Sequence, residues 1–137
     1  MRTNPYLMFD GQCKTAFEFY AKCLGGRIEM MQTHGESPAK DHTPPEWHDK
    51  VIHARLTAGD VVLMGSDAPP GHQEKPQGMW VSLDVDKPAD AQRIFSALAD
   101  RGQVKMPFGQ TFWAAGGFGM VVDRFGTPWM VNCNTAA

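Results

Sequence analysis

His53 and Arg55 stand two residues apart in a short segment of alternating residue types, and they are the first candidates for chemistry. The segment reads Ile52-His53-Ala54-Arg55-Leu56, so a strand here places both basic side chains on one face and the apolar ones on the other. If the basic face lines a cavity, His53 is a polar anchor for a ligand or a general base. If that face packs against a helix, His53 is a partly buried structural residue.

Three more histidines lie in or beside a polar, proline-rich segment over residues 33–49, namely His34, His42 and His48. Glu46 and Asp49 add carboxylates to the same segment. One interpretation is a metal site, which would require the segment to fold back onto a sheet. The alternative is a loop whose histidines are solvated.

Tryptophan is frequent, and three of the four tryptophans fall in or beside predicted strands of the second half: Trp80, Trp113 and Trp129. They fit the packing of a core. They fit equally an aromatic wall that stacks on a flat or cationic ligand, with methionines such as Met130 as adaptable lining.

The three cysteines, Cys13, Cys23 and Cys133, are an odd number and form no Cys-x-x-Cys motif. This pattern predicts three reduced thiols and argues against a zinc site made of thiolates. A reactive thiolate at Cys13 is the alternative, because that residue lies near the start of a predicted helix.

Charge and hydropathy exclude several classes of partner. Thirteen Lys and Arg against fifteen Asp and Glu leave a net charge of −2, which argues against binding to nucleic acid or to an anionic membrane. No apolar run approaches the roughly 20 residues that span a bilayer. The first apolar run, residues 6–9, is too short for a signal peptide, so the expected location is the cytoplasm.

Hydrophobic periodicity predicts two copies of one β-α-β-β-β unit, over residues 1–66 and 79–137, joined by a linker over 67–78. The predicted helices cover residues 13–24 and a segment from Pro88 to just before Gly102, with Asp86 as a cap of the second. The predicted strands are 6–9, 27–31, 51–57, 60–64, 79–85, 104–108, 118–122 and 128–133.

A unit of this size cannot bury its apolar face alone, so two copies must pack together. We therefore predict one compact α+β domain in which the two βαβββ repeats pair into a curled mixed sheet with a cleft, and the helices lie on the outer face. The pairing can occur within one chain or between two chains.

Several segments resemble the PhnB-like branch of the vicinal-oxygen-chelate superfamily, which includes glyoxalase I, extradiol dioxygenases, and the bleomycin and fosfomycin resistance proteins. They are residues 16–20, 52–56, 62–69 and 111–114, and the more specific Asp123-Arg124-Phe125-Gly126-Thr127-Pro128-Trp129-Met130-Val131-Asn132. Members of this branch are often labelled as methyltransferases. The glycine-rich run at 116–119 lies between two predicted strands, whereas a methyltransferase needs such a run between a strand and a helix.

The resemblance implies four cavity-facing positions at which the superfamily's metal enzymes carry His, Gln or Glu. They transfer to Pro5, Leu63, Trp80 and Met130, and a shift of one residue also yields no His, Asp or Glu. Divalent transition metals need three or four nitrogen or oxygen ligands, so we expect no metal and no cofactor.

The leading hypothesis is a metal-free member of the superfamily that binds a small organic molecule in a cavity lined by aromatic and methionine side chains. Its expected ligand-binding residues are His53, Leu63, Trp80, Trp113 and Met130, and no residue is assigned a catalytic role. The alternative is a metal-dependent lyase or dioxygenase of the glyoxalase type. In a third reading, bulky side chains fill the cavity and the protein acts through dimer surfaces. The resemblance also implies a homodimer.

Overall fold

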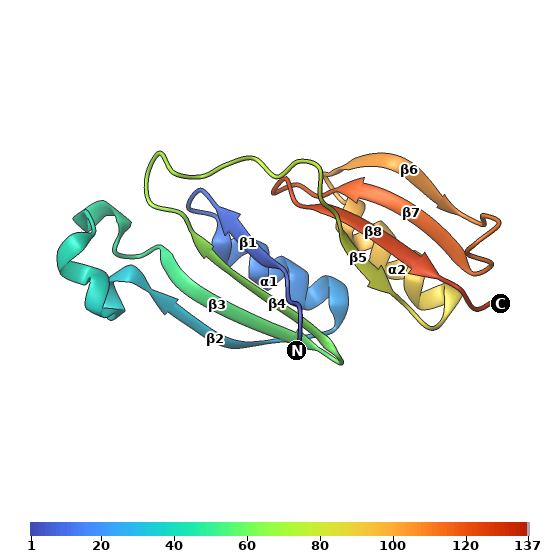
Figure 1. The fold of residues 1–137 in the computed structure, drawn as a ribbon, viewed down its shortest axis with the longest axis horizontal. Coiled ribbons are helices and arrows are strands. Elements are labelled where there is room, and N and C mark those ends of the chain that lie inside the picture. The colour runs from blue at the N-terminus through green and yellow to red at the C-terminus, as the bar shows by residue number, and fades with distance from the viewer. Residues whose placement is uncertain (137) are drawn as a thin grey trace. The chain divides into compact units, whose positions relative to one another are not determined.

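The computed structural model describes residues 1–136 and divides into two compact units, Met1–Glu74 and Lys75–Ala137. Each unit contains one mixed four-stranded sheet and one helix of twelve residues (Figure 1). Both sheets are open, with two edges each. The predicted α+β class and the β-α-β-β-β order of each copy are confirmed.

The first unit contains β1 (Tyr6–Phe9), α1 (Cys13–Leu24), β2 (Arg27–Thr33), β3 (Val51–Ala58) and β4 (Val61–Asp67). The strand order is β1-β4-β3-β2, with β1 parallel to β4 and the other pairs antiparallel. The predicted loop between β2 and β3 contains three short 3₁₀ turns: η1 (His34–Glu36), η2 (Pro38–His42) and η3 (Pro45–Trp47). Prolines at the start of η2 and η3 suit these turns, since a first helical position needs no backbone donor.

Helix α1 covers one face of the first sheet because its apolar residues fall on one side (Figure 1). Phe17 and Tyr20 are fully buried on that side. A Cβ atom at Gly65 of β4 would lie 2.8 Å from the ring of Phe17, so this glycine lets the helix approach the sheet. The helix ends at Gly25, whose φ of +65° places it in the left-handed conformation typical of helix ends.

The second unit contains β5 (Val81–Asp84), α2 (Pro88–Ala99), β6 (Gln103–Gly109), β7 (Gly117–Val122) and β8 (Pro128–Cys133). Its strand order, β5-β8-β7-β6, repeats that of the first unit, again with a parallel first pair. Helix α2 covers one face of this sheet, and Phe95 rests on Gly119 there as Phe17 does on Gly65.

Two sequence-based expectations for the second unit need correction. Strand β5 begins at Val81, so Met79 and Trp80 lie outside it. The residue that precedes α2 is Lys87, not Asp86, and it makes no side-chain capping hydrogen bond. Pro88 at the first helical position leaves one donor fewer to cap, which reduces the need for an acidic cap.

The outer strands β2 and β6 pair irregularly with their neighbours. Strand β2 has register shifts between Ile28 and Met30 and again between Gln32 and Thr33. The register between β6 and β7 shifts on either side of Met106. Strand β6 also contains Pro107, whose backbone nitrogen donates no hydrogen bond. Such bulges bend a strand and interrupt its ladder.

Neither of the two twelve-residue helices in the described chain has the length and apolar character needed to cross a membrane.

Candidate functional site

Each sheet has one face against its helix and a second face that carries no helix, which we call the open face of that unit. The register assigns side chains to it, because paired residues point to the same side and alternate along each strand. In the first unit, Gly65 points at the helix, so its neighbours Met64 and Ser66 belong to the open face. The pairings then place one row on that face, listed from β1 to β2 as Tyr6, Met64, Arg55 and Met30.

Tyr6 and His53 form the polar centre of the first open face. The phenol oxygen of Tyr6 lies 3.1 Å from Nδ1 of His53, and the two rings stack with their centroids 5.7 Å apart. The residues are 47 positions apart in sequence, and Tyr6 is 44% exposed. The pair is therefore preorganised and open to solvent, as a ligand contact requires.

Methionines surround this pair. Met8 and Met30 are each 40% exposed, and Met64 is half-buried beside Tyr6. The hydroxyl of Ser66 donates a 3.5 Å hydrogen bond to the sulfur of Met8. Methionine side chains adapt to irregular apolar shapes, so this surface suits a small, partly apolar molecule.

Glu29 lies at the rim of the first open face and is held by other side chains. Thr57 Oγ1 donates to its Oε1 at 2.7 Å, and Arg27 Nε donates to the same oxygen at 2.8 Å. Hydrogen bonds from Thr57 and Arg27 lower the pKa of this carboxyl, with the charges of Arg27 and Arg55 acting in the same direction. The carboxylate is thus already engaged at the pH of the cell.

The open face of the second unit is more apolar. Gly119 points at α2, so Phe118 and Met120 belong to the open face. The register continues this row from Met120 to Met130 of β8 and to Met106 of β6. Three methionines thus replace the mixed row of the first unit. At its end, the Asn132 amide donates to Asp84 Oδ1 at 3.1 Å.

The predicted ligand-binding residues are distributed over both units. His53 lies on the first open face and Met130 on the second. Trp113, in the connection between β6 and β7, is 47% exposed and packs edge-on against Phe118, with ring centroids 5.3 Å apart. Trp80 is half-buried directly before β5. The structure brings Trp113 to an open-face residue and leaves Trp80 outside the strands.

Leu63 lies on the other side of its sheet. It pairs with Leu56, has no exposed surface, and shares the helix-facing side with Gly65. Its neighbour Met64 takes the open-face position instead, because side chains alternate along a strand. Sequence reasoning allowed for this shift of one residue, but the all-apolar start of β4 offers no alternation to choose between the two.

Trp129 is a core residue of the second unit. It has no exposed surface, and its indole N–H donates to Asp123 Oδ2 at 2.8 Å. The other oxygen of Asp123 accepts the backbone N–H groups of Phe125 and Thr127 at 2.8 and 3.0 Å. The Asp123 carboxylate therefore holds both the β7–β8 turn and the tryptophan that packs beneath it.

Asp67 is the buried carboxylate of the first unit, and it binds two segments that are far apart in the sequence. It accepts the backbone N–H of Cys13 and that of Val51, both at 2.9 Å, and so joins the start of α1 to the start of β3. Burial, and secondarily the charge of Asp67, raises the pKa of the Cys13 thiol. Cys13 is therefore held as a thiol, which argues against its use as a thiolate nucleophile.

The loop histidines do not gather into a metal site. Nε2 of His48 donates to the carbonyl oxygens of Thr43 and Lys40 at 2.9 and 3.0 Å, so this nitrogen is engaged. His34 is buried in η1. Across residues 1–136, no three His, Cys, Asp or Glu side chains lie together in a way that could hold a metal ion.

The strands that would supply the superfamily's metal ligands are β1, β4, β5 and β8, and their donors do not fit a transition metal. One set of paired open-face positions on these strands carries tyrosine, methionine and serine: Tyr6, Met64, Ser82 and Met130. The next set along the strands is Met8, Ser66, Asp84 and Asn132. Neither set offers the combination of imidazole and carboxylate donors that Zn, Ni, Mn or Fe requires.

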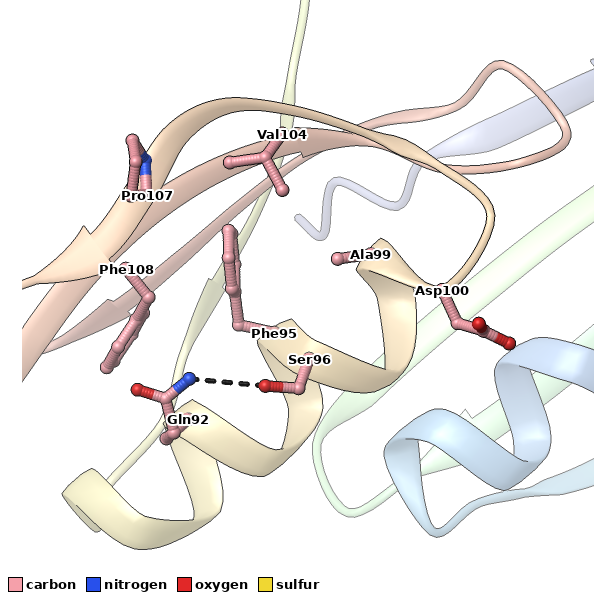
Figure 2. A pocket seen from close by; sticks show the side chains of 8 residues that line it. All are labelled: Gln92, Phe95, Ser96, Ala99, Asp100, Val104, Pro107 and Phe108. Carbon is pink, nitrogen blue, oxygen red and sulfur yellow. Dashed lines mark hydrogen bonds between the residues drawn. The ribbon is translucent and has the colours of Figure 1, made fainter.

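The second unit also has a groove of about 390 Å³ between α2 and β6 (Figure 2). Phe95, Phe108 and Val104 form its apolar walls, and Gln92 Nε2 donates to Ser96 Oγ at 3.2 Å along one side. None of the predicted ligand-binding residues lines this groove.

Comparison with known proteins agrees with this architecture. A family model described as 3-demethylubiquinone-9 3-methyltransferase matches residues 1–132. The chain is 34% identical to Protein YjdN of Escherichia coli (strain K12), over 96% of this chain and 95% of that one. Its sequence is 48% identical to that of protein PA1353 from Pseudomonas aeruginosa, over 97% of both chains. The crystal structure of that protein matches this chain with a TM-score of 0.87.

The fold is also that of the PhnB protein from Bacillus cereus, at 22% identity and a TM-score of 0.80, over 97% of this chain and 99% of that one. The chain belongs to the family described as 3-demethylubiquinone-9 3-methyltransferase, whose model matches almost its whole length. Its fold is also shared with the fosfomycin resistance protein FosX from Listeria monocytogenes, at 7% identity and a TM-score of 0.65, over 98% of this chain and 93% of that one. The fold is thus the one that the resemblance to the vicinal-oxygen-chelate superfamily implied.

The glycine-rich run at residues 116–119 has a packing role. A Cβ atom at Gly116 would collide with Cys133 and with the backbone of Thr135, and one at Gly117 would collide with the ring of Phe108. These glycines allow the start of β7 to lie close to its neighbours. They do not lead from a strand into a helix, which is the arrangement that cradles a nucleotide-like cofactor.

Proposed function

We propose that this protein binds a small organic molecule through the open faces of its sheets without a metal ion. The observation that carries the proposal is the Tyr6–His53 pair, a preorganised polar contact surrounded by partly exposed methionines. Stable packing does not require a histidine and a tyrosine to hold each other on an exposed surface. Ligand sites, in contrast, combine apolar lining with a few placed polar groups.

The second open face supplies complementary chemistry for the same function. Met106, Met120 and Met130 form an adaptable apolar row, and Trp113 against Phe118 adds aromatic surface at its end. Flat or flexible apolar parts of a ligand are suited to such side chains. Trp80 and Met130 remain proposed ligand contacts, whereas Leu63 is replaced in this role by Met64.

A metal-dependent lyase or dioxygenase is the alternative within the superfamily. The donor types on β1, β4, β5 and β8 argue against it, because thioether, phenol and hydroxyl groups dominate those positions. Elemental analysis after dialysis separates the two functions. We expect less than about 0.1 equivalent of Ni, Zn, Mn or Fe per chain, and a stoichiometric amount of any of them would replace our proposal with the metal enzyme.

The family description names a methyl transfer, for which the packing role of the glycine-rich run gives no support. We therefore do not extend the methyltransferase activity to this chain. Isothermal titration with S-adenosylmethionine tests this point directly, and we expect no saturable heat.

The methionines provide a direct test of ligand binding, because they report on separate parts of the chain. Met8, Met30 and Met64 lie on the first open face, and Met106, Met120 and Met130 on the second. With ¹³C-methyl-labelled methionine, titration with small aromatic probes such as benzamide and benzoate is expected to shift these six signals. Met31 pairs with the helix-facing Ala54, and Met1 lies outside the strands, so these two serve as internal controls.

Two variants tie the shifts to the proposed site. His53→Phe removes the polar contact but keeps a ring, and we expect it to weaken probe binding to the first face. Arg93→Met changes an exposed residue of α2 and should leave binding unchanged. Signals that shift only at the two control methionines, or that do not shift at any concentration up to the solubility limit, would contradict the proposal.

We further infer a cytoplasmic homodimer. The three buried and unbridged cysteines suit a reducing compartment. Phe112 is 98% exposed beside Trp113, and aromatic side chains of this kind are enriched in interfaces. Light scattering is expected to give a mass near twice 15.1 kDa, and the monomer mass at micromolar concentration would refute this assembly.

A further inference from the structure

Arg55 is a cation of the first open face that forms no ion pair with a carboxylate of the described chain. Its guanidinium makes no hydrogen bond or ion pair to any residue in the described part of the chain. The nearby carboxylate, Glu29, is already occupied by Thr57 and Arg27. Arg55 is also only partly exposed, so its charge is less screened than that of a fully solvated side chain.

His53 adds a second donor to the same surface. A phenol donates more readily than it accepts, and a deprotonated imidazole nitrogen is a strong acceptor, so Tyr6 donates to Nδ1 of His53. The remaining ring proton then sits on Nε2, which has no partner among residues 1–136. If the ring is protonated, Nε2 still carries a proton. In either state, this nitrogen is a donor that faces no protein acceptor.

We propose that the open face of the first unit selects small organic oxyanions, such as carboxylates or sulfonates that bear an apolar group. Arg55 and Nε2 of His53 would hold the anionic group, and the methionines beside them would contact the apolar part. This inference rests on the proposed function and adds the charge class of the ligand. An oxyanion is the group that satisfies both donors at once, and Arg binds carboxylates with paired hydrogen bonds.

The second unit supplies the internal contrast. Arg55 pairs with Met64 on the last strand of the first unit, and Met120 pairs with Met130 on the last strand of the second. Met120 is therefore the counterpart of Arg55. By the same register His53 corresponds to Phe118. The second open face therefore lacks both donors at these positions, so anion selectivity belongs to the first unit alone.

Benzoate and benzamide test the proposal, because they have nearly the same size and differ in charge. By isothermal titration at low ionic strength, we expect the Kd for benzoate to be at least about tenfold below that for benzamide. Added salt should weaken the binding of benzoate and leave that of benzamide nearly unchanged. In the methionine spectrum, benzoate should shift Met8, Met30 and Met64 more strongly than Met106, Met120 and Met130.

Arg55→Met installs the residue found in the second unit and should remove the preference for benzoate while the weak binding of benzamide persists. Arg55→Lys keeps the charge and should retain part of the preference. Arg93→Met, a change at an exposed arginine on α2, is the matched control and should retain all of it.

The outcomes separate this inference from the function on which it rests. Equal binding of benzoate and benzamide at the open-face methionines, or an undiminished preference in Arg55→Met, would overturn the anion selectivity and leave the small-molecule site standing. No binding of either probe at those methionines would overturn both.

Discussion

Phe17 of the first unit rests on Gly65, and Phe95 of the second rests on Gly119 in the same way. Across the sheet from these contacts, the units differ. Tyr6, His53 and Arg55 occupy open-face positions in the first unit, and Phe118, Met120 and Met130 do so in the second. Close packing tolerates few changes on the helix side. The open face has no such neighbour, so the two copies of one unit have acquired different chemistry there.

The largest expected effect tests the likeness of the helix-facing sides. Phe17→Ala and Phe95→Ala should each lower the free energy of unfolding by about 3–5 kcal/mol, because each removes a buried ring from a close-packed contact. Urea denaturation measures both losses. Arg93→Ala is the control, since this side chain is largely exposed on α2 and its removal should change stability by less than about 0.5 kcal/mol. A small loss at only one of the two buried positions would break the comparison.

The buried carboxylates show how differently the two units use the same group. In Asp67→Asn, one of the backbone N–H groups of Cys13 and Val51 loses its acceptor, and a cost of about 1–3 kcal/mol is expected. Asp123→Asn should cost a similar amount through the turn and Trp129.

A double-mutant cycle distinguishes the two carboxylates. The effects of Asp123→Asn and Trp129→Phe should be non-additive because the two side chains share a hydrogen bond, whereas those of Asp67→Asn and Trp129→Phe should add. Additivity in the first pair would mean that the indole bond contributes nothing to stability.

Alkaline pH should destabilise the first unit through Cys13, because no cysteine begins the helix of the second unit. Cys13 begins α1, whereas Pro88 begins α2. Burial raises the pKa of Cys13 in the folded chain, so the unfolded chain loses this proton first as the pH rises. The stabilisation is complete below the ordinary pKa of the thiol and declines above it. Cys13→Ala should therefore flatten the fall in stability between about pH 8 and 10, as followed by urea midpoints. An unchanged slope would show that Cys13 does not contribute.

The smallest expected effect lies on the open face. His53→Phe, which installs the second unit's residue, should change the free energy of unfolding by less than about 0.5 kcal/mol because the Tyr6–His53 contact is exposed. The same variant is expected to weaken ligand binding, so stability and binding separate at one position. A loss of several kcal/mol would instead make His53 a structural residue.

Much of the fold follows from local patterns. The first strand, the first helix and the last strand have the predicted bounds, because Gly11, Gly25 and the turn before Pro128 interrupt clear periodicities. The 3₁₀ turns of residues 34–47 were not predicted, because each is only three to five residues long and shows no helical periodicity. The start of β5 was placed too early, since Met79 and Trp80 continue its apolar character without joining its ladder.

The candidate site was predicted less completely. The pattern around His53 indicated that it shares a face with Arg55, and the structure agrees. It could not reveal Tyr6, whose contact with His53 joins strands far apart in sequence. The position of Leu63 depended on which of two adjacent apolar residues faces the helix. Only the partner strand and the helix contact resolve that choice.

The irregular outer strands also affect how the protein behaves at high concentration. An exposed, regular strand edge is a template on which other chains can add and form fibrils. Here β1 and β5 are only four residues long, β2 has two register shifts, and β6 combines register shifts with Pro107. Every sheet edge is therefore short or interrupted. Although Val104 and Met106 are exposed along β6, the ladder there cannot be extended over many residues, which protects the chain from strand-by-strand aggregation during expression and storage.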